Sequence, residues 1–145
     1  MPEKCRVNVC GFDPVLVKGY IKTGERALWW YLPDQLYEDF EVKPGDTVKG
    51  TLFTIYSPKA EPVMSDATPF EWQASKETGM AVLIPSDQIL KYQLTAFNFL
   101  ELTVEKIVRA SGEEVEVYPG EEKISVKFWP EDKMKLNYFA AFAAP

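Results

Sequence analysis

The sequence contains no histidine, and its 145 residues include only two cysteines, Cys5 and Cys10. A serine or cysteine nucleophile activated by histidine is therefore excluded. A structural zinc site needs about four cysteine or histidine ligands, which this chain cannot supply. The odd separation of the two cysteines would turn them to opposite faces of one strand, too far apart for a disulfide. We expect both to be small buried hydrophobic residues, with no bound metal and no cofactor.

Long apolar runs are also missing. Nowhere do about 18 apolar residues follow one another, and the opening MPEKCRVNVCGF lacks the apolar core of a signal peptide. We therefore expect a cytoplasmic protein without a membrane partner. The sequence also has no G-x-S-x-G, Walker A or G-x-G-x-x-G stretch. Catalysis by carboxylate, lysine or tyrosine stays open, but no group of residues indicates it, and we favour a non-catalytic protein.

The composition, with 46% hydrophobic and 26% charged residues, is typical of one globular domain over residues 1–145. The formal net charge is -6. Residues 1–60 are neutral, with eight basic and eight acidic residues, whereas residues 61–145 hold eight basic and fourteen acidic residues. Because neutralisation of phosphates supplies most non-specific affinity for nucleic acids, such a chain must gather its basic groups on one face to bind DNA.

Runs of β-branched and aromatic residues predict a mainly β protein. The clearest are ALWWYL, TVKGTLFTIY, MAVLI, FLELTVEKIV and KISVKFW. Between them, residues 57–79 contain three prolines and no sustained period, which predicts a long loop with at most one short strand. Phe70 and Trp72 in this loop are candidates for binding a protein partner. Near the end of the chain, Pro130 followed by acidic residues predicts the start of a C-terminal helix.

Two segments, 28–56 and 80–108, match when one is shifted by 52 positions, which places Pro33 on Pro85 and Asp46 on Asn98. The match predicts two strand-helix-strand units whose short helices begin at the two prolines and which superpose about a pseudo-twofold axis. Identities are few, so chance matching of two similar segments is the alternative. At the turn after the first helix, Pro44-Gly45-Asp46 predicts a positive φ at Gly45. The second segment has Phe97 at this position, so we expect a different turn there.

The stretch TGERALWWYLPDQLYEDFEVKPGDTVKGTL resembles the AbrB/SpoVT family unit, in which a strand ends in Leu-Pro and a short helix leads to Pro-Gly-Asp. The resemblance covers residues 15–56 well and residues 75–108 weakly. It implies a closed or partly open β-barrel of cradle-loop or double-psi type, built from the two units. It also implies DNA contacts from basic residues near the first turn. Arg26 matches that turn, and Lys18 and Lys22 precede it.

Three functions follow as hypotheses. The first is a non-catalytic regulatory module of AbrB-like type that binds duplex DNA through Lys18, Lys22 and Arg26, as a monomer or homodimer. The second is a protein-interaction adaptor, which fits the acidic charge and Phe70 and Trp72 better. The third is a small-molecule transferase like the cradle-loop kinases. Whether the aromatic run 29–31 is core or a surface that stacks a ligand stays open, since neighbouring side chains on a strand face opposite ways and at least one side must be core.

Overall fold

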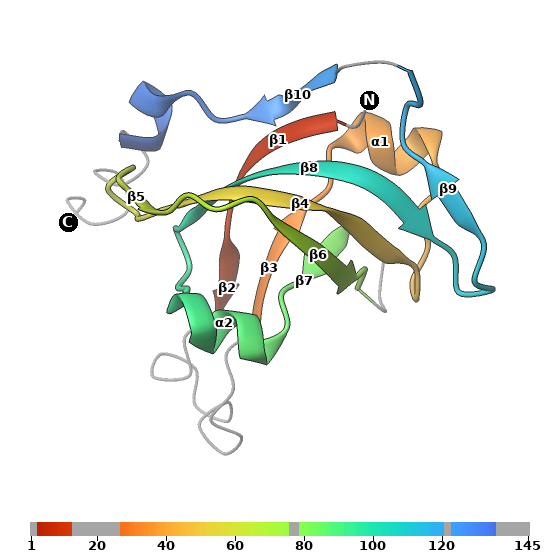
Figure 1. Cartoon of the computed structure of the whole chain (residues 1–145), viewed down its shortest axis with the longest axis horizontal. Helices are drawn as coiled ribbons and strands as arrows, with labels where there is room; N and C mark the ends of the chain where they lie inside the picture. Colours follow the sequence, from red (N-terminus) through yellow and green to blue (C-terminus); the bar gives the residue numbers. More distant parts are fainter. Residues whose placement is uncertain (1–2, 13–26, 76–78, 121–122, 136–145) are drawn as a thin grey trace.

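The computed structural model describes residues 3–12, 27–75, 79–120 and 123–135. The fold is mainly β, as predicted (Figure 1). The first part of the chain forms β1 (Glu3–Asn8), β2 (Cys10–Phe12), β3 (Ala27–Tyr31), α1 (Asp34–Asp39) and β4 (Thr47–Tyr56). Then come β5 (Pro62–Met64), β6 (Thr68–Gln73), β7 (Ala81–Leu83), α2 (Ser86–Tyr92), β8 (Phe99–Val108), β9 (Glu114–Glu116) and β10 (Lys123–Phe128).

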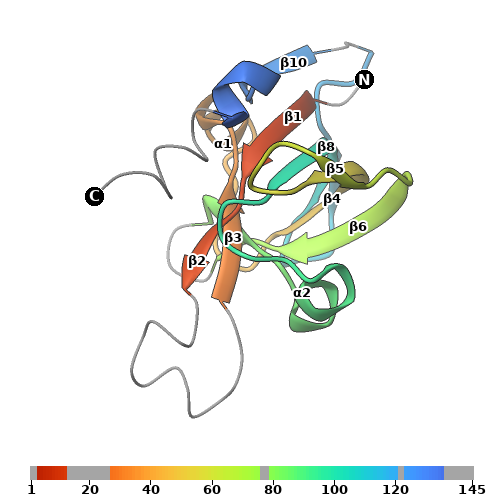
Figure 2. The same cartoon turned by 90° about the vertical axis from the view of Figure 1, so that its left-hand side faces the viewer.

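These strands form two sheets. The larger has the order β10-β1-β8-β4-β5, with β6 also paired to β4 and β9 to β8, and the smaller is β2-β3-β7. The smaller sheet lies behind the larger one in Figure 1, and Figure 2 shows the two side on. The described strands thus make two sheets and no closed barrel, which corrects the closed form of the expected barrel, while the partly open form stays a prediction. Only the mainly β class of that expectation is confirmed.

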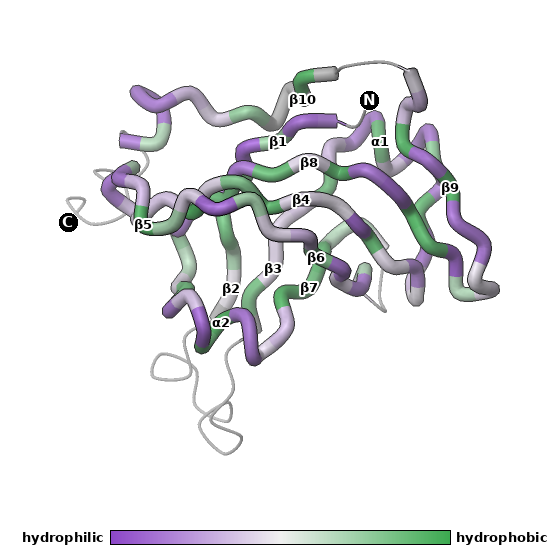
Figure 3. Tube along the Cα trace, in the orientation of Figure 1, coloured by the Kyte–Doolittle hydropathy of each residue, from purple (hydrophilic) through white to green (hydrophobic). Residues whose placement is uncertain are grey.

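The hydrophobic core lies between the sheets. Side chains alternate along β4 and β8, so that Val48, Leu52, Leu102 and Val104 point inward and are buried, while their neighbours are more exposed. From the smaller sheet Trp30 is fully buried, and its ring meets that of Phe70 on β6 edge to face. Figure 3 shows the hydrophobic residues along the central strands, with hydrophilic residues dominating β9.

The two helices follow Pro33 and Pro85, as predicted. Tyr37 N–H donates to the carbonyl of Pro33 at 3.0 Å, and Ile89 N–H donates to that of Pro85 at 3.1 Å. Each helix is short, with six residues in α1 and seven in α2. A further helical turn over residues 131–135 follows Pro130, which confirms the C-terminal helix as far as the chain is described.

Elements of the two predicted units recur at the predicted shift, since Thr47 plus 52 is Phe99 and Tyr56 plus 52 is Val108, the bounds of β4 and β8. Both central strand pairs are antiparallel. Trp30 lies opposite Val82, and Thr51 lies opposite Thr103. Each of these pairs joins positions 52 apart, as a twofold axis through the pair would require. Superposition of the units stays a prediction, and these registers support it.

The turns after the two helices share one backbone conformation. Gly45 has φ 92°, as predicted, and Phe97 has φ 80°. The expectation that phenylalanine would impose a different turn is therefore wrong. The reason lies one residue on, where a carboxylate oxygen of Asp46 accepts the N–H of Lys43 at 3.0 Å and the amide oxygen of Asn98 accepts that of Thr95 at 2.8 Å. These buried side chains hold both turns, and they hold the second against the preference of a bulky residue for negative φ.

The segment expected to be a long loop, 57–79, contains two strands, β5 and β6. Its proline Pro69 sits within β6, which is an edge strand, where a missing N–H is tolerated. Cys5 is buried as expected, whereas Cys10 is half-buried.

Candidate interaction surface

The outer side of the smaller sheet is apolar. Alternation along β3 turns Leu28 and Trp30 inward, so Trp29 and Tyr31 face outward. Residues directly opposite on antiparallel strands share a face, which adds the partners of these two aromatic residues. We call the resulting set the apolar face: Cys10, Trp29, Tyr31, Ala81 and Leu83. The set contains no aspartate, glutamate, lysine or arginine, and Tyr31 and Leu83 are 41% and 40% exposed.

Phe97 lies beside this face. Its N–H donates to the carbonyl of Val9 at 2.9 Å, and the N–H of Val9 donates to the carbonyl of Asn98, so the turn is fastened to the strand that continues into Cys10. The side chain of Phe97 is 39% exposed. A large aromatic residue at positive φ is a backbone outlier, and such outliers cluster at functional sites. Phe97 thus exposes aromatic area on this turn at a cost in backbone strain.

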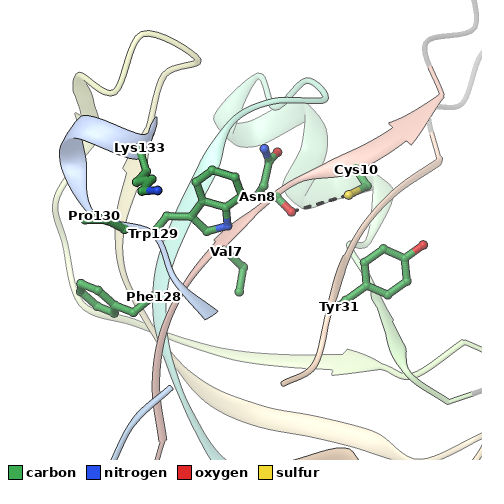
Figure 4. A pocket seen from close by; sticks show the side chains of 8 residues that line it. All are labelled: Val7, Asn8, Cys10, Tyr31, Phe128, Trp129, Pro130 and Lys133. Carbon is green, nitrogen blue, oxygen red and sulfur yellow. Dashed lines mark hydrogen bonds between the residues drawn. The ribbon is translucent and has the colours of Figure 1, made fainter. Parts of the chain in front are cut away.

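A pocket of about 510 Å³ opens between the apolar face and the end of β10. Figure 4 shows Cys10 and Tyr31 on one side, Phe128, Trp129 and Lys133 on the other, and Val7 and Asn8 between them. Its walls are mainly aromatic and aliphatic, with one amide and one ammonium group. Ligand pockets in proteins have this size and this balance of many apolar groups to few polar ones. The pocket can therefore receive a large apolar side chain or a small molecule.

Arg6 holds the aromatic wall of this pocket in place. Its guanidinium pairs with Glu101 at 2.8 Å and donates to the carbonyl of Trp129 at 2.9 Å. The same group lies over the ring of Phe128, 4.4 Å from the centroid, and over that of Tyr56 at 5.1 Å. Because most of these contacts are partly buried, they are screened less than surface ion pairs. They fix the segment after β10 against β1.

The hydroxyl of Tyr56 interacts with the same Arg6 and Glu101 side chains. Burial raises the pKa of its hydroxyl above the usual 10.0, and the negative charge of Glu101 raises it further, while Arg6 acts in the opposite direction. The hydroxyl lies 3.4 Å from an Arg6 nitrogen. A raised pKa keeps this tyrosine protonated at neutral pH. It therefore acts as a hydrogen-bonding group beside Arg6 and not as a general base.

The outer face of the larger sheet has a different character. Thr51 and Thr103 both donate to one carboxylate oxygen of Glu105, at 2.6 and 2.9 Å. Nearby, Lys49 pairs with Glu114 at 3.3 Å, and this contact, followed by the charge of Lys106, lowers the pKa of the Glu114 carboxyl. These described polar groups are paired with one another on a partly solvated surface.

Of the five candidate site residues predicted from the sequence, the structure describes two. Lys18, Lys22 and Arg26 lie outside the described residues. Phe70 and Trp72 are on β6 and point into the core, with 7% and 3% of their surface exposed. Their rings pack on each other with centroids 4.6 Å apart. As core residues they present almost no side-chain area to a partner.

The surface that does present aromatic area contains part of the run 29–31, which the sequence leaves open between core and binding surface. Alternation in ALWWY already places Trp29 and Tyr31 on one side of a strand. What the sequence did not indicate is that Leu83 and Phe97 join them, because both come from the second unit and depend on strand pairing over more than 50 positions.

Comparison of the chain with protein-family models, curated proteins and solved structures gives no match. No helix in the described part of the chain has the length and apolar character needed to span a membrane. Within the described ranges, no group of three or more cysteine, aspartate or glutamate side chains could hold a metal ion.

Proposed function

We propose that the chain is a non-catalytic protein-interaction module whose partner docks on the apolar face and inserts a side chain into the adjoining pocket. The observation that carries this proposal is the exposure of Tyr31 and Leu83, at 41% and 40%, on the apolar face, whose residues Cys10 and Tyr31 also line the pocket. Phe97, on the turn bonded to Val9, is 39% exposed. Contiguous exposed apolar area bordered by polar groups is typical of interaction sites. Aromatic residues near the centre of such a site supply most of the affinity.

The energetics favour a protein partner. Burying the exposed part of each of these side chains contributes a fraction of the roughly 1.5–3 kcal/mol that full burial of an apolar side chain supplies. A partner must therefore cover several of them together and fill the pocket to offset the entropy lost on association. The pocket wall is already fixed by Arg6, so little further ordering is needed when a partner side chain enters.

The proposal is tested by substituting Tyr31 and Leu83 together by glutamate. The charges would stay solvated in the free protein, because both side chains are exposed, but would be buried in a complex. Leu90→Glu is the matched control, since Leu90 is 79% exposed on α2, outside the apolar face. Immobilised wild-type chain and the Leu90→Glu variant should retain the same protein partner from cell extract, and the double variant should lose it. Equal retention by all three would refute the proposal.

A DNA-binding regulator of AbrB-like type is the second candidate, and it would use a duplicated cradle-loop arrangement. Support for the arrangement comes from the two central strand pairs, whose registers are centred on residues 52 positions apart. The test is a fluorescence-anisotropy titration with duplex DNA at two salt concentrations. DNA binding would show a log-log salt slope of about -0.9 for each phosphate contacted, and Arg26→Ala would reduce it by about one unit. Absence of binding at low salt would leave the protein-interaction module.

A further inference from the structure

Strands β1 and β6 occupy equivalent places in the fold, but their outer edges are covered differently. Each strand has six residues, and β6 corresponds to β1 with a shift of 65, since Glu3 plus 65 is Thr68. Glu3 lies opposite Val104 of β8, and Thr68 lies opposite Leu52 of β4. Val104 and Leu52 are 52 positions apart, which is the shift between the two units. β1 therefore pairs with β8, the last strand of the second unit, in the same register in which β6 pairs with β4, the last strand of the first unit. The two strands thus occupy equivalent places.

On its other edge, β1 carries β10. The two strands are parallel, with Lys4 opposite Ile124 and Arg6 opposite Phe128. After β10 ends, the N–H of Trp129 donates to the carbonyl of Arg6 at 3.1 Å. The backbone groups of even-numbered β1 residues therefore point toward β10, and the chain itself shows how an extended segment docks at this place.

The equivalent edge of β6 carries no strand over residues 68–72 in the described part of the chain. A single described bridge, between Ala74 and Val82, lies just beyond this segment. Ala74 N–H donates to the carbonyl of Asp46 on the β4 side, at 2.8 Å. Backbone groups alternate along a strand, so those of Pro69 and Glu71 point away from β4, toward the open edge.

A groove of about 240 Å³ runs along this open edge. Residues 68–72 of β6 form one side, and Pro85, Asp87, Gln88 and Lys91, at and within α2, form the other. Figure 2 shows α2 beneath β6. A strand edge that borders a groove can offer an extended segment main-chain hydrogen bonds.

We propose that the edge of β6 beside α2 is a strand-addition site, which binds an extended segment of a partner protein in the parallel orientation that β10 takes on β1. The segment alternates polar and apolar residues as β10 does, and it pairs with the N–H and carbonyl of Glu71 and the carbonyl of Pro69. Strand addition of this kind draws affinity from the backbone and specificity from the side chains on either side. Pro69 offers no N–H, which limits pairing with arbitrary strands.

The test uses a fluorescent peptide of the sequence KISVKFWP, residues 123–130 of this chain, titrated into the full chain. The Glu71→Pro variant removes the backbone donor from the open edge, where proline is already accepted two residues earlier, and Glu71→Ala keeps the donor. Loss of one backbone hydrogen bond should weaken binding about five- to tenfold in Glu71→Pro and leave Glu71→Ala close to wild type. Pro69→Ala adds a donor and should strengthen binding about threefold.

Amide hydrogen exchange of the wild-type chain supplies a readout that does not depend on the variants folding. Bound peptide should slow exchange of the Glu71 amide. Binding that leaves the Glu71 amide unprotected and is insensitive to Glu71→Pro would mean that the peptide displaces β10 from β1, and would overturn the proposal. Absence of peptide binding would overturn it as well. The edge of β6 is distinct from the apolar face, so either result leaves the proposed function to its own test.

Discussion

Replacing Gly45 by alanine isolates the conformational requirement of the turn after α1. Gly45 has φ 92°, in the region that residues with a Cβ atom rarely adopt. A Cβ atom built at this position meets only the Cβ of Ala110 within 4 Å, at 3.8 Å, which is an ordinary contact. The substitution therefore introduces no clash, and its effect on stability comes from the backbone.

The expected magnitude is the difference of two opposing effects. The left-handed conformation costs a residue with a Cβ atom roughly 1–2 kcal/mol. Alanine also restricts the unfolded chain, which stabilises the folded state by about 0.4–1 kcal/mol relative to glycine. The free energy of unfolding should thus fall by on the order of 1 kcal/mol, which lowers the melting temperature of a chain of this length by about 3 °C.

Urea denaturation followed by circular dichroism measures this change. The midpoint should decrease while the slope stays constant, because the surface exposed on unfolding is unaltered. Gly112→Ala is the matched control, since Gly112 has φ 96° and a Cβ atom there would meet nothing within 4 Å. The two variants should lose similar stability. An unchanged midpoint in Gly45→Ala would refute the assignment of strain to this turn, and a loss above about 3 kcal/mol would mean that packing is involved.

Three further outcomes are expected. At position 97, with φ 80°, the glycine variant should be more stable than the alanine variant by about 1 kcal/mol in urea, the reverse of their order within a strand. Gly50→Ala should cost at least about 3 kcal/mol or prevent folding, because its Cβ would lie 1.8 Å from the carbonyl oxygen of Thr103, and a circular-dichroism melt will detect this. Because the folded state raises the pKa of Tyr56, stability should be full below pH 10.0 and fall as pH rises toward the folded pKa. Melts of Tyr56→Phe from pH 8 to 11 should show a smaller decrease than wild type, and parallel curves would contradict this assignment.

Much of the local structure could be predicted because it depends on neighbouring residues. The alternation in β4 and β8 fixed which side chains are buried, and Pro33 and Pro85 marked the helix starts. The shift of 52 positions was visible because both units repeat strand, proline and helix in the same order. Gly45 was predictable since few residues other than glycine accept its conformation.

Long-range pairing was not predictable in the same way. Phe70 and Trp72 were placed on a loop because prolines interrupt the period of residues 57–79, but pairing with β4 imposes strand alternation and buries both rings. Parallel pairing of β10 with β1 joins residues 120 positions apart, as in Glu3 opposite Lys123, and no local pattern encodes it. The strained conformation of Phe97 is held by the Asn98 side chain, which accepts the N–H of Thr95 within the turn, and by the carbonyl of Val9, which accepts the N–H of Phe97.

The places where the two units differ coincide with the surfaces proposed for binding. The first unit has Gly45 in its turn, which adopts a positive φ without strain. The second unit has Phe97 there, which retains backbone strain and exposes an aromatic ring next to the apolar face. Where β1 is covered by β10, the equivalent edge of β6 beside α2 carries no strand in the described part of the chain. The shared framework explains stability, since the central strand pairs and the Asp46 and Asn98 turns serve both units alike. Phe97 retains backbone strain and the described edge of β6 carries no strand, so we propose partner binding as the role of both departures.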